Sequence, residues 1–345
     1  MRSDVGGERL RAARARGGLS QAELARRARV SRGTVSAIEH GRHIPAVDAA
    51  LRLASVLGVS AEALFGARDP MTPVAALDES LADGMLVRAC RVGEQVVVTP
   101  VTGGNDPAGW GAVDGVIDGR ALRLFAEGST GGALVLGCDP ALAVVDELSA
   151  RRGGERVVGV SATSGQALRA LRAGRCHAAL VHARSDELPS PPVRVARWHL
   201  ARWRVGIAVH RSLGSPSLES MLAGETPMIR RHATAASDQA VVRAARRLGL
   251  TDAPPGPKAS GHLDAAQRAA WMRAAAVTFE PAAGEHDLGF EALETHVVQL
   301  WVAEPWRAHP AITTLLDIVA SRAFCERVGA HDGYDLHGSA SAIAV

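Results

Sequence analysis

The feature that most constrains the fold is an alternation of short apolar runs and helical segments that begins near Ala133. The runs ALVLG, RVVGVS and HAALVHA are rich in branched residues, and the segments PALAVVDELSARRG and SGQALRALRAG between them have the apolar spacing of helices. Strands that alternate with helices form βαβ units, so we predict a mainly parallel sheet covered by helices. Further strands and helices follow, and the last predicted helix runs from Ala311 to Val328.

The length of 345 residues is enough for two or three domains, each with a core of its own. Two prolines and a lack of periodicity between residues 67 and 84 predict a linker. Beyond it, two β-rich runs, Met85 to Val92 and Gln95 to Val101, are joined by a Gly-Glu turn, as in a hairpin. We therefore expect a helical domain at 1–66, a linker at 67–84, a β-rich connecting segment at 85–130 and an α/β domain at 131–345.

The first 66 residues carry the signals of five short helices. Ser20 and Glu23 form a capping box, which predicts the start of the second helix. Ser31 is placed to cap a third helix that ends at Gly41, so the pattern is helix, short turn, helix. Residues 1–70 hold 12 Arg against 7 Asp and Glu, a net charge of +5, although the whole chain carries only +3. The positive charge is concentrated where a phosphate backbone could attract it.

The segment LSQAELARRARVSRGTVSAIEHGRHIPAVDAALRLASVLGVS closely resembles the XRE-type helix-turn-helix domain of Cro and the phage repressors. The resemblance covers roughly residues 6–66. It implies that Gln21 lies against the DNA backbone, that the third helix lies in the major groove, and that Arg14 and Glu39 form an internal salt bridge. The alternative is an Ala-rich helical bundle that binds another protein.

The spacing within the third helix agrees with a role in reading DNA. Val35 and Ile38 are spaced to pack inward, which leaves the N-terminal residues of the helix free to reach base edges. Arg32 is the candidate for a guanine, and Arg42, just past the helix, is placed for the DNA backbone. The predicted DNA-binding residues are Gln21, Ser31, Arg32, Gly33, Thr34, Ser36, Arg42 and His43.

The region from Gly131 to Tyr334 resembles the periplasmic-binding-protein-like domains that are fused to helix-turn-helix modules in bacterial regulators. The matching pieces are GCDPAL, SGQALRALRAGRCHAALVH, MIRRHATAASD and HDGYD. The resemblance implies two α/β lobes that close over a ligand at the carboxyl ends of strands. We expect lobe 1 at about 131–205 and 293–345, and lobe 2 at about 206–292.

The candidate ligand-binding residues stand where predicted strands give way to helices. Hydroxyls, an arginine and helix N-termini at such corners suit a carboxylate or an oxyanion. Asp139 and Glu280 would repel a dianion such as molybdate and would favour a ligand amine, so we expect an organic, zwitterionic metabolite. Taken singly, Asp139, Ser164 and Ser237 are better explained as helix caps, Arg231 as part of a surface ion pair and Glu280 as a solvated side chain; as a set they indicate a cleft. The predicted set is Cys138, Asp139, Thr163, Ser164, Arg231, Thr234, Ser237 and Glu280.

Other classes of function have weaker support in the sequence. The chain has no G-x-S-x-G elbow, Walker loop, H-E-x-x-H or G-x-G-x-x-G opening a βαβ unit, so we expect neither an enzyme nor a bound cofactor. The four Cys lack a C-x-x-C pair and the 13 His lack ligand spacing, so no metal site is predicted, and His177 and His182 are interpreted as structural. Without a signal peptide or a long apolar run, a cytoplasmic location is expected.

Together these features predict a multidomain, ligand-responsive bacterial transcription regulator. An all-α helix-turn-helix domain would bind a two-fold DNA operator as a homodimer or larger assembly, and a two-lobed α/β domain would bind a small-molecule effector. Two alternatives remain: a regulator that responds to molybdate, another oxyanion or a metal, and a DNA-binding protein whose large domain only oligomerises.

Overall fold

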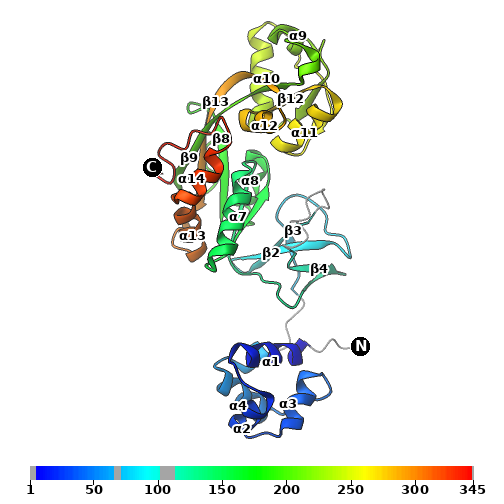
Figure 1. The fold of residues 1–345 in the computed structure, drawn as a ribbon, viewed down its shortest axis with the longest axis vertical. Helices are drawn as coiled ribbons and strands as arrows, with labels where there is room; N and C mark the ends of the chain where they lie inside the picture. The colour runs from blue at the N-terminus through cyan, green and yellow to red at the C-terminus, as the bar shows by residue number, and fades with distance from the viewer. Residues whose placement is uncertain (1–4, 66–70, 102–112, 344–345) are drawn as a thin grey trace. The chain divides into compact units, whose positions relative to one another are not determined.

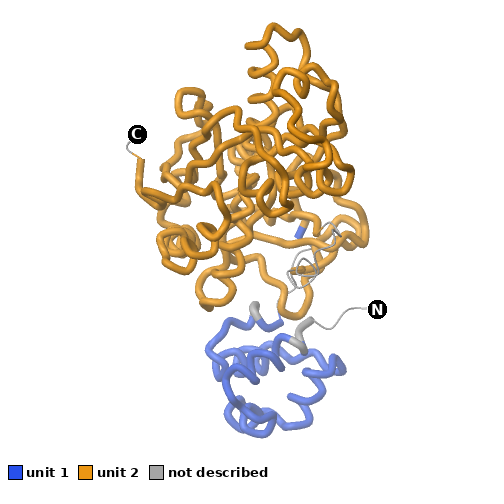
Figure 2. The backbone as a smooth tube through the Cα atoms, turned by 45° about the horizontal axis from the view of Figure 1, so that its top comes forward, with its two compact units in different colours: residues 1–71 blue, residues 72–345 orange. Residues whose placement is uncertain are grey.

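The protein is described by a computed structural model covering residues 5–65, 71–101 and 113–343 (Figure 1). The chain forms two compact units, residues 1–71 and 72–345 (Figure 2). Within the described residues, every helix is too short or too polar to cross a lipid bilayer.

The described residues of unit 1 form a bundle of five helices around a small apolar core. Its capping box is confirmed, because Glu23 N donates to Ser20 Oγ (3.1 Å) and Ser20 N donates to Glu23 Oε2 (2.9 Å). Arg29 adopts a left-handed conformation (φ 54°) that ends the second helix, and Ser31 then caps the third. The helices are α1 (Val5–Arg16), α2 (Gln21–Ala28), α3 (Arg32–Glu39), α4 (Val47–Leu57) and α5 (Ala61–Phe65).

Unit 2 begins with a sheet that has five strands in its described residues and extends further than predicted. The hairpin is present as β2 and β3, but the expected linker also contributes the strand β1, which pairs with β3. Cys90 and Val97 share an apolar core with Leu134 and Leu136 of the next sheet. The predicted connecting segment is therefore packed into unit 2. The strands are β1 (Val74–Ala75), β2 (Leu86–Val92), β3 (Gln95–Pro100), β4 (Gly115–Asp118) and β5 (Ala121–Leu124), in the order β1-β3-β2-β4-β5.

The larger sheet of unit 2 is mixed, which corrects the expectation of a mainly parallel one. Its outer strands pair in parallel, but the long central strands β9 and β13 run antiparallel to each other and to their neighbours. The order is β11-β10-β12-β9-β13-β8-β6-β7, and β14 pairs with β9. The strands are β6 (Ala133–Gly137), β7 (Val157–Ser161), β8 (Ala178–Ala183), β9 (Val195–Val209), β10 (Met228–Arg231), β11 (Lys258–Ala259), β12 (Ala275–Phe279), β13 (Gly289–Ala303) and β14 (Ala342–Ile343).

The central strands connect two halves of this sheet, as Figure 1 shows. The first half holds β6 to β8 with α7 (Ala141–Arg152), α8 (Ser164–Arg172), α13 (Pro310–Val319) and α14 (Arg322–Gly329). The second half holds β10 to β12 with α9 (Leu218–Ala223), α10 (Ala236–Arg247), α11 (His262–Met272) and α12 (Glu280–Glu285).

The expected lobe boundaries fall inside the central strands, where Gly206 pairs with Ala292. The register shifts between Ala292 and Glu294, a bulge that bends the strand. A Cβ on Gly206 would collide with the carbonyl oxygen of Glu291, so the close approach of the strands needs glycine here.

The C-terminal helix predicted from Ala311 to Val328 is two helices. The first, α13, ends at Val319, and Ser321 Oγ accepts a hydrogen bond from Phe324 N (3.3 Å) to cap α14. An internal N-cap serine interrupted what reads as one continuous apolar pattern.

Candidate functional site

The N-terminal end of α3 presents the surface predicted to meet DNA. Val35 and Ile38 are buried in the core of unit 1, as their spacing predicted, while Arg32 and Gly33 are exposed. Ser31 is exposed too, but its hydroxyl accepts from Thr34 N (2.9 Å) and contacts Thr34 Oγ1 (2.8 Å), so it also caps α3. Of the other predicted residues, Arg42 and His43 are exposed, and Thr34 and Ser36 are half-buried.

A buried ion pair fixes α3 against α1 and α2. Arg14 Nε donates to Glu39 Oε1 (2.6 Å) and Arg14 Nη2 to Glu39 Oε2 (3.1 Å), which confirms the internal salt bridge. Gln21 Nε2 donates to the same carboxylate (2.7 Å), so this side chain is held by the scaffold. Burial disfavours the Glu39 anion, but these hydrogen bonds and the Arg14 charge outweigh it and lower the pKa of Glu39.

In unit 2 the most informative predicted residue is Arg231, at the end of β10. Its side chain is 1% exposed, and neither Nε nor Nη1 has a hydrogen-bond partner in the described part of the chain. The adjacent Arg230 differs, because it is buried in a bidentate pair with Asp238, both Nε–Oδ1 and Nη2–Oδ2 being 2.9 Å. Burial lowers the pKa of Arg231, with partial compensation from Cys138 and Asp238. A buried guanidinium is costly unless it is paired and hydrogen-bonded.

Other buried polar side chains of unit 2 also have atoms without a partner among the described residues. Asp139 Oδ1 accepts from Ala141 N (2.9 Å) and from Tyr334 Oη (2.7 Å), but its Oδ2 has no partner among the described residues. Burial raises the pKa of Asp139 to about 6. Trp203 Nε1 and Ser237 Oγ are likewise buried without a partner in these parts of the chain. Ser237 therefore does not cap α10, because the N-cap residue is Ala235 and Ser237 lies within the first turn of the helix.

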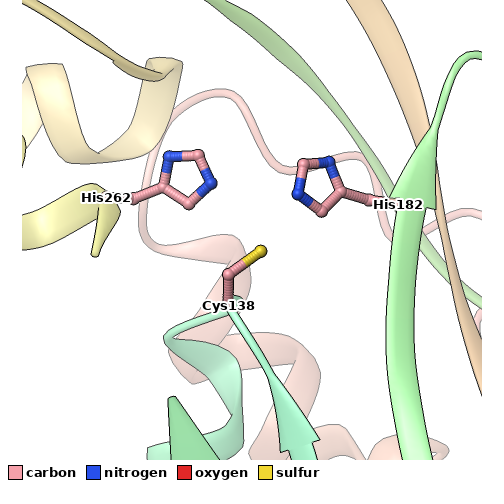
Figure 3. A group of neighbouring side chains, drawn as sticks. All are labelled: Cys138, His182 and His262. Atoms are coloured by element: carbon pink, nitrogen blue, oxygen red, sulfur yellow. The ribbon is translucent and has the colours of Figure 1, made fainter. Parts of the chain in front are cut away.

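Three more side chains at this place could hold a metal ion: Cys138, His182 and His262 (Figure 3). All are buried, and their ligand atoms lie within 4.8 Å of one another. Burial raises the pKa of the Cys138 thiol to about 12 and keeps the pKa of both imidazoles well below the usual value, where the Arg231 charge adds to the effect. We call the side chains of Cys138, Asp139, His182, Trp203, Arg231, Ser237, His262 and Tyr334 the buried cluster.

The remaining predicted residues have structural duties. Thr163 caps α8 through Gln166, and its hydroxyl lies 3.4 Å from that of Thr234, which joins the two halves of the sheet. Ser164 Oγ accepts from His182 N (3.2 Å). Glu280 is bound bidentately by Arg204, so its charge is already neutralised, contrary to the expectation that it would attract a ligand amine.

Sequence reasoning missed His182, Trp203, His262 and Tyr334. The motif HDGYD contains Tyr334. The other three residues lie far apart in the sequence, on β8, β9 and α11, and only the tertiary structure brings them together. A surface hollow of about 370 Å³ near β14 contains none of the predicted residues.

Comparison with known families assigns both parts of the chain. Residues 10–64 match the helix-turn-helix family, in agreement with the predicted XRE-type resemblance. Residues 145–320, 176 of the 345, match the PBP superfamily domain. The chain belongs to the PBP superfamily. Among curated proteins, none matches the chain.

Solved structures resemble parts of this PBP-superfamily protein. The cofactor-binding domain of the Cbl transcriptional regulator is 14% identical, over 58% of this chain and 92% of that chain, with a TM-score of 0.42. The restriction-modification controller protein C.AhdI from Aeromonas hydrophila is 35% identical, over 18% of this chain and 96% of that chain (TM-score 0.17). SinR, the master regulator for biofilm formation, in complex with DNA, is 32% identical, over 17% of this chain and 95% of that chain (TM-score 0.17).

The chain thus joins an XRE-type helix-turn-helix to a PBP-superfamily domain. This is the architecture of a DNA-binding transcription regulator with an effector-binding domain.

Proposed function

We propose that this protein is a transcription regulator whose DNA affinity depends on a small anionic effector bound in the buried cluster. The observation that carries the proposal is Arg231, a buried guanidinium without an acidic partner among the described residues. Such a group costs free energy in the unliganded protein, and an anionic ligand supplies the missing acceptors.

The polar atoms of the cluster define the chemistry of the effector. Arg231, Trp203 and Ser237 offer donors that lack partners in the described residues, whereas Asp139 Oδ2 offers an acceptor. A carboxylate can accept from the guanidinium while an amine or hydroxyl of the same molecule donates to Asp139. This donor and acceptor pattern favours an organic zwitterion over molybdate, which would bring only oxygens to the Asp139 carboxylate.

The cluster is placed to link effector binding to a change in shape. Arg231 and Ser237 belong to the second half of the sheet, and Cys138 and Asp139 to the first. A ligand that contacts both halves stabilises their closed arrangement, and it shifts DNA affinity only if that arrangement differs in affinity for the operator. We propose regulation of this kind in a homodimer, since two recognition helices read a two-fold operator.

The effector proposal is tested by thermal unfolding in the presence of small metabolites. Amino acids and hydroxycarboxylates are compared with molybdate, since a ligand that binds only the folded state raises its melting temperature. At 100 times its Kd a ligand adds about 2.7 kcal/mol to the free energy of unfolding. Stabilisation by molybdate alone would support the oxyanion alternative, and stabilisation by none of the compounds would support a domain that only oligomerises.

The DNA proposal is tested with an operator selected from random duplexes. Arg32→Ala is expected to relax the sequence preference, whereas Arg42→Ala is expected to weaken binding to all DNA and reduce the salt slope by about one. Arg322→Ala, which alters a 90% exposed side chain in unit 2, is the matched control. Unchanged binding by both unit 1 variants contradicts the proposed docking of α3.

A further inference from the structure

Three side chains of the buried cluster point their ligand atoms at one place. Cys138 directly follows β6, His182 lies on β8, and His262 begins α11. Figure 3 shows a ring nitrogen of each histidine turned toward the other, with the sulfur of Cys138 beside both. A thiolate and two imidazoles are ligands that soft and borderline transition metals prefer.

A chain of hydrogen bonds sets the tautomer of His182. Arg243 holds the Glu294 carboxylate with two bonds (2.8 and 2.6 Å), and that carboxylate accepts from His296 Nε2 (3.1 Å). His296 Nδ1 is then an acceptor, so His182 Nδ1 must donate across the 2.9 Å contact between them. His182 Nε2 is left with a lone pair directed at the shared place.

The tautomer of His262 is set by Thr278. The Thr278 hydroxyl donates its single hydrogen to His262 O (2.9 Å), so Thr278 Oγ1 can only accept from His262 Nδ1 at 3.4 Å. His262 Nε2 therefore carries a lone pair, and this buried atom has no hydrogen-bond partner in the described part of the chain. Second-shell bonds of this kind orient histidines that ligate metals.

We propose that Cys138, His182 and His262 form a transition-metal site that binds Cu(I). In the metal-free protein the Cys138 S–H can donate to only one of the two nitrogens, so the other lone pair stays unsatisfied. A metal ion satisfies all three ligands at once. On binding, the thiol proton leaves to solvent, the sulfur bonds to the metal as a thiolate, and the neutral imidazoles release no proton.

Charge decides between the candidate ions. The buried guanidinium of Arg231 lies near Cys138, His182 and His262 and brings a positive charge to the site. Cu(I) with one thiolate is neutral, whereas Zn²⁺ with one thiolate keeps a net positive charge beside the guanidinium. A soft monovalent ion is therefore favoured, in a trigonal arrangement of one sulfur and two nitrogens.

The metal would also connect the two halves of the sheet. Cys138 and His182 come from the first half, and His262 comes from the second. Because its ligand atoms, which all lie within 4.8 Å of one another, come from both halves, a bound metal ion would hold the two halves together. This consequence rests on the proposed function, because the metal would act as a second signal only at a cluster that also binds the effector.

The site is tested by titrating the reduced full-length protein with Cu(I), and with Ag(I) as a redox-inert probe, in competition with a chelator. We expect one ion per chain, and X-ray absorption of the Cu(I) complex should show one sulfur and two nitrogen donors. Cys138→Ser and His262→Gln are expected to weaken binding at least about 100-fold, because even second-shell changes cost 10–100-fold. Cys176→Ser, which alters an equally buried thiol elsewhere, should bind as the wild type does.

Two results overturn the site: a wild-type protein that takes no Cu(I) from the chelator, or equal affinities for the wild type and both ligand variants. Far-ultraviolet circular dichroism identifies a variant that does not fold. In that case the X-ray absorption of the wild type tests the site by itself, because donors other than one sulfur and two nitrogens would overturn it. The effector and DNA measurements are made on chelator-treated protein, so a failure of the metal site leaves them unaffected.

Discussion

The two adjacent arginines of β10 allow a test in which neighbouring substitutions have opposite effects. Arg231→Met replaces a buried guanidinium that lacks partners in the described residues with an apolar side chain of similar length. Arg230→Met removes a guanidinium that is equally buried but bonded bidentately to Asp238. The two positions therefore differ in pairing far more than in burial.

The magnitudes follow from the hydrogen-bond inventory. Each unsatisfied buried donor costs about 1–3 kcal/mol, and Arg231 has two of them. Arg231→Met removes both unsatisfied donors, so the unliganded variant should be more stable than the wild type by at least about 1–3 kcal/mol. Arg230→Met should lose about 3–5 kcal/mol, because it leaves Asp238 buried without its partner.

Intrinsic fluorescence measures these changes in unit 2 alone, since all six Trp lie beyond residue 100. Urea unfolding of the unliganded protein gives the free energies. In the same experiment an effector that stabilises the wild type should no longer stabilise Arg231→Met, because charge-assisted bonds worth about 1.5–3 kcal/mol each are gone. If Arg231→Met destabilised the unliganded protein as much as Arg230→Met, Arg231 would be satisfied in the free state and the effector argument would be wrong.

Two further predictions concern ionisation. Glu39→Gln should destabilise unit 1 by about 2–4 kcal/mol, because the Glu39 carboxylate is 0% exposed beside Arg14. In the wild type this stabilisation is present above pH 4.5 and should be lost as the pH falls through the lowered pKa of Glu39. Circular dichroism of the helices measures the acid unfolding transition, and the same transition in the variant and the wild type would refute the prediction. The pKa of Asp139 is raised from 3.8 to about 6, so unliganded unit 2 should lose about 3 kcal/mol of stability as the pH rises from about 3 to about 7. Asp139→Asn should remove this loss, and an identical dependence of stability on pH in the variant, measured by Trp fluorescence, would count against it.

Local signals in the sequence determined the helix-turn-helix unit. The capping box at Ser20, the inward spacing of Val35 and Ile38, and the Arg14–Glu39 pair all depend on residues close in sequence or on a specific motif, and all are present in the structure. The strand and helix alternation after Ala133 was readable for the same reason, because periodicity is a local property. The break at Ser321 was missed because a serine inside an apolar pattern can either cap a new helix or lie within one continuous helix.

The tertiary structure alone decided the sheet order and the composition of the buried cluster. Long antiparallel strands at the centre of the sheet bring β6, β8, β10 and α11 to one place, and no sequence spacing encodes that neighbourhood. His182 and His262 are 80 residues apart, so their shared orientation toward Cys138 could not be seen before folding. Likewise, nothing local distinguishes Arg230 from Arg231: which one meets a carboxylate depends on side-chain direction along a strand, since successive residues face opposite sides of a sheet.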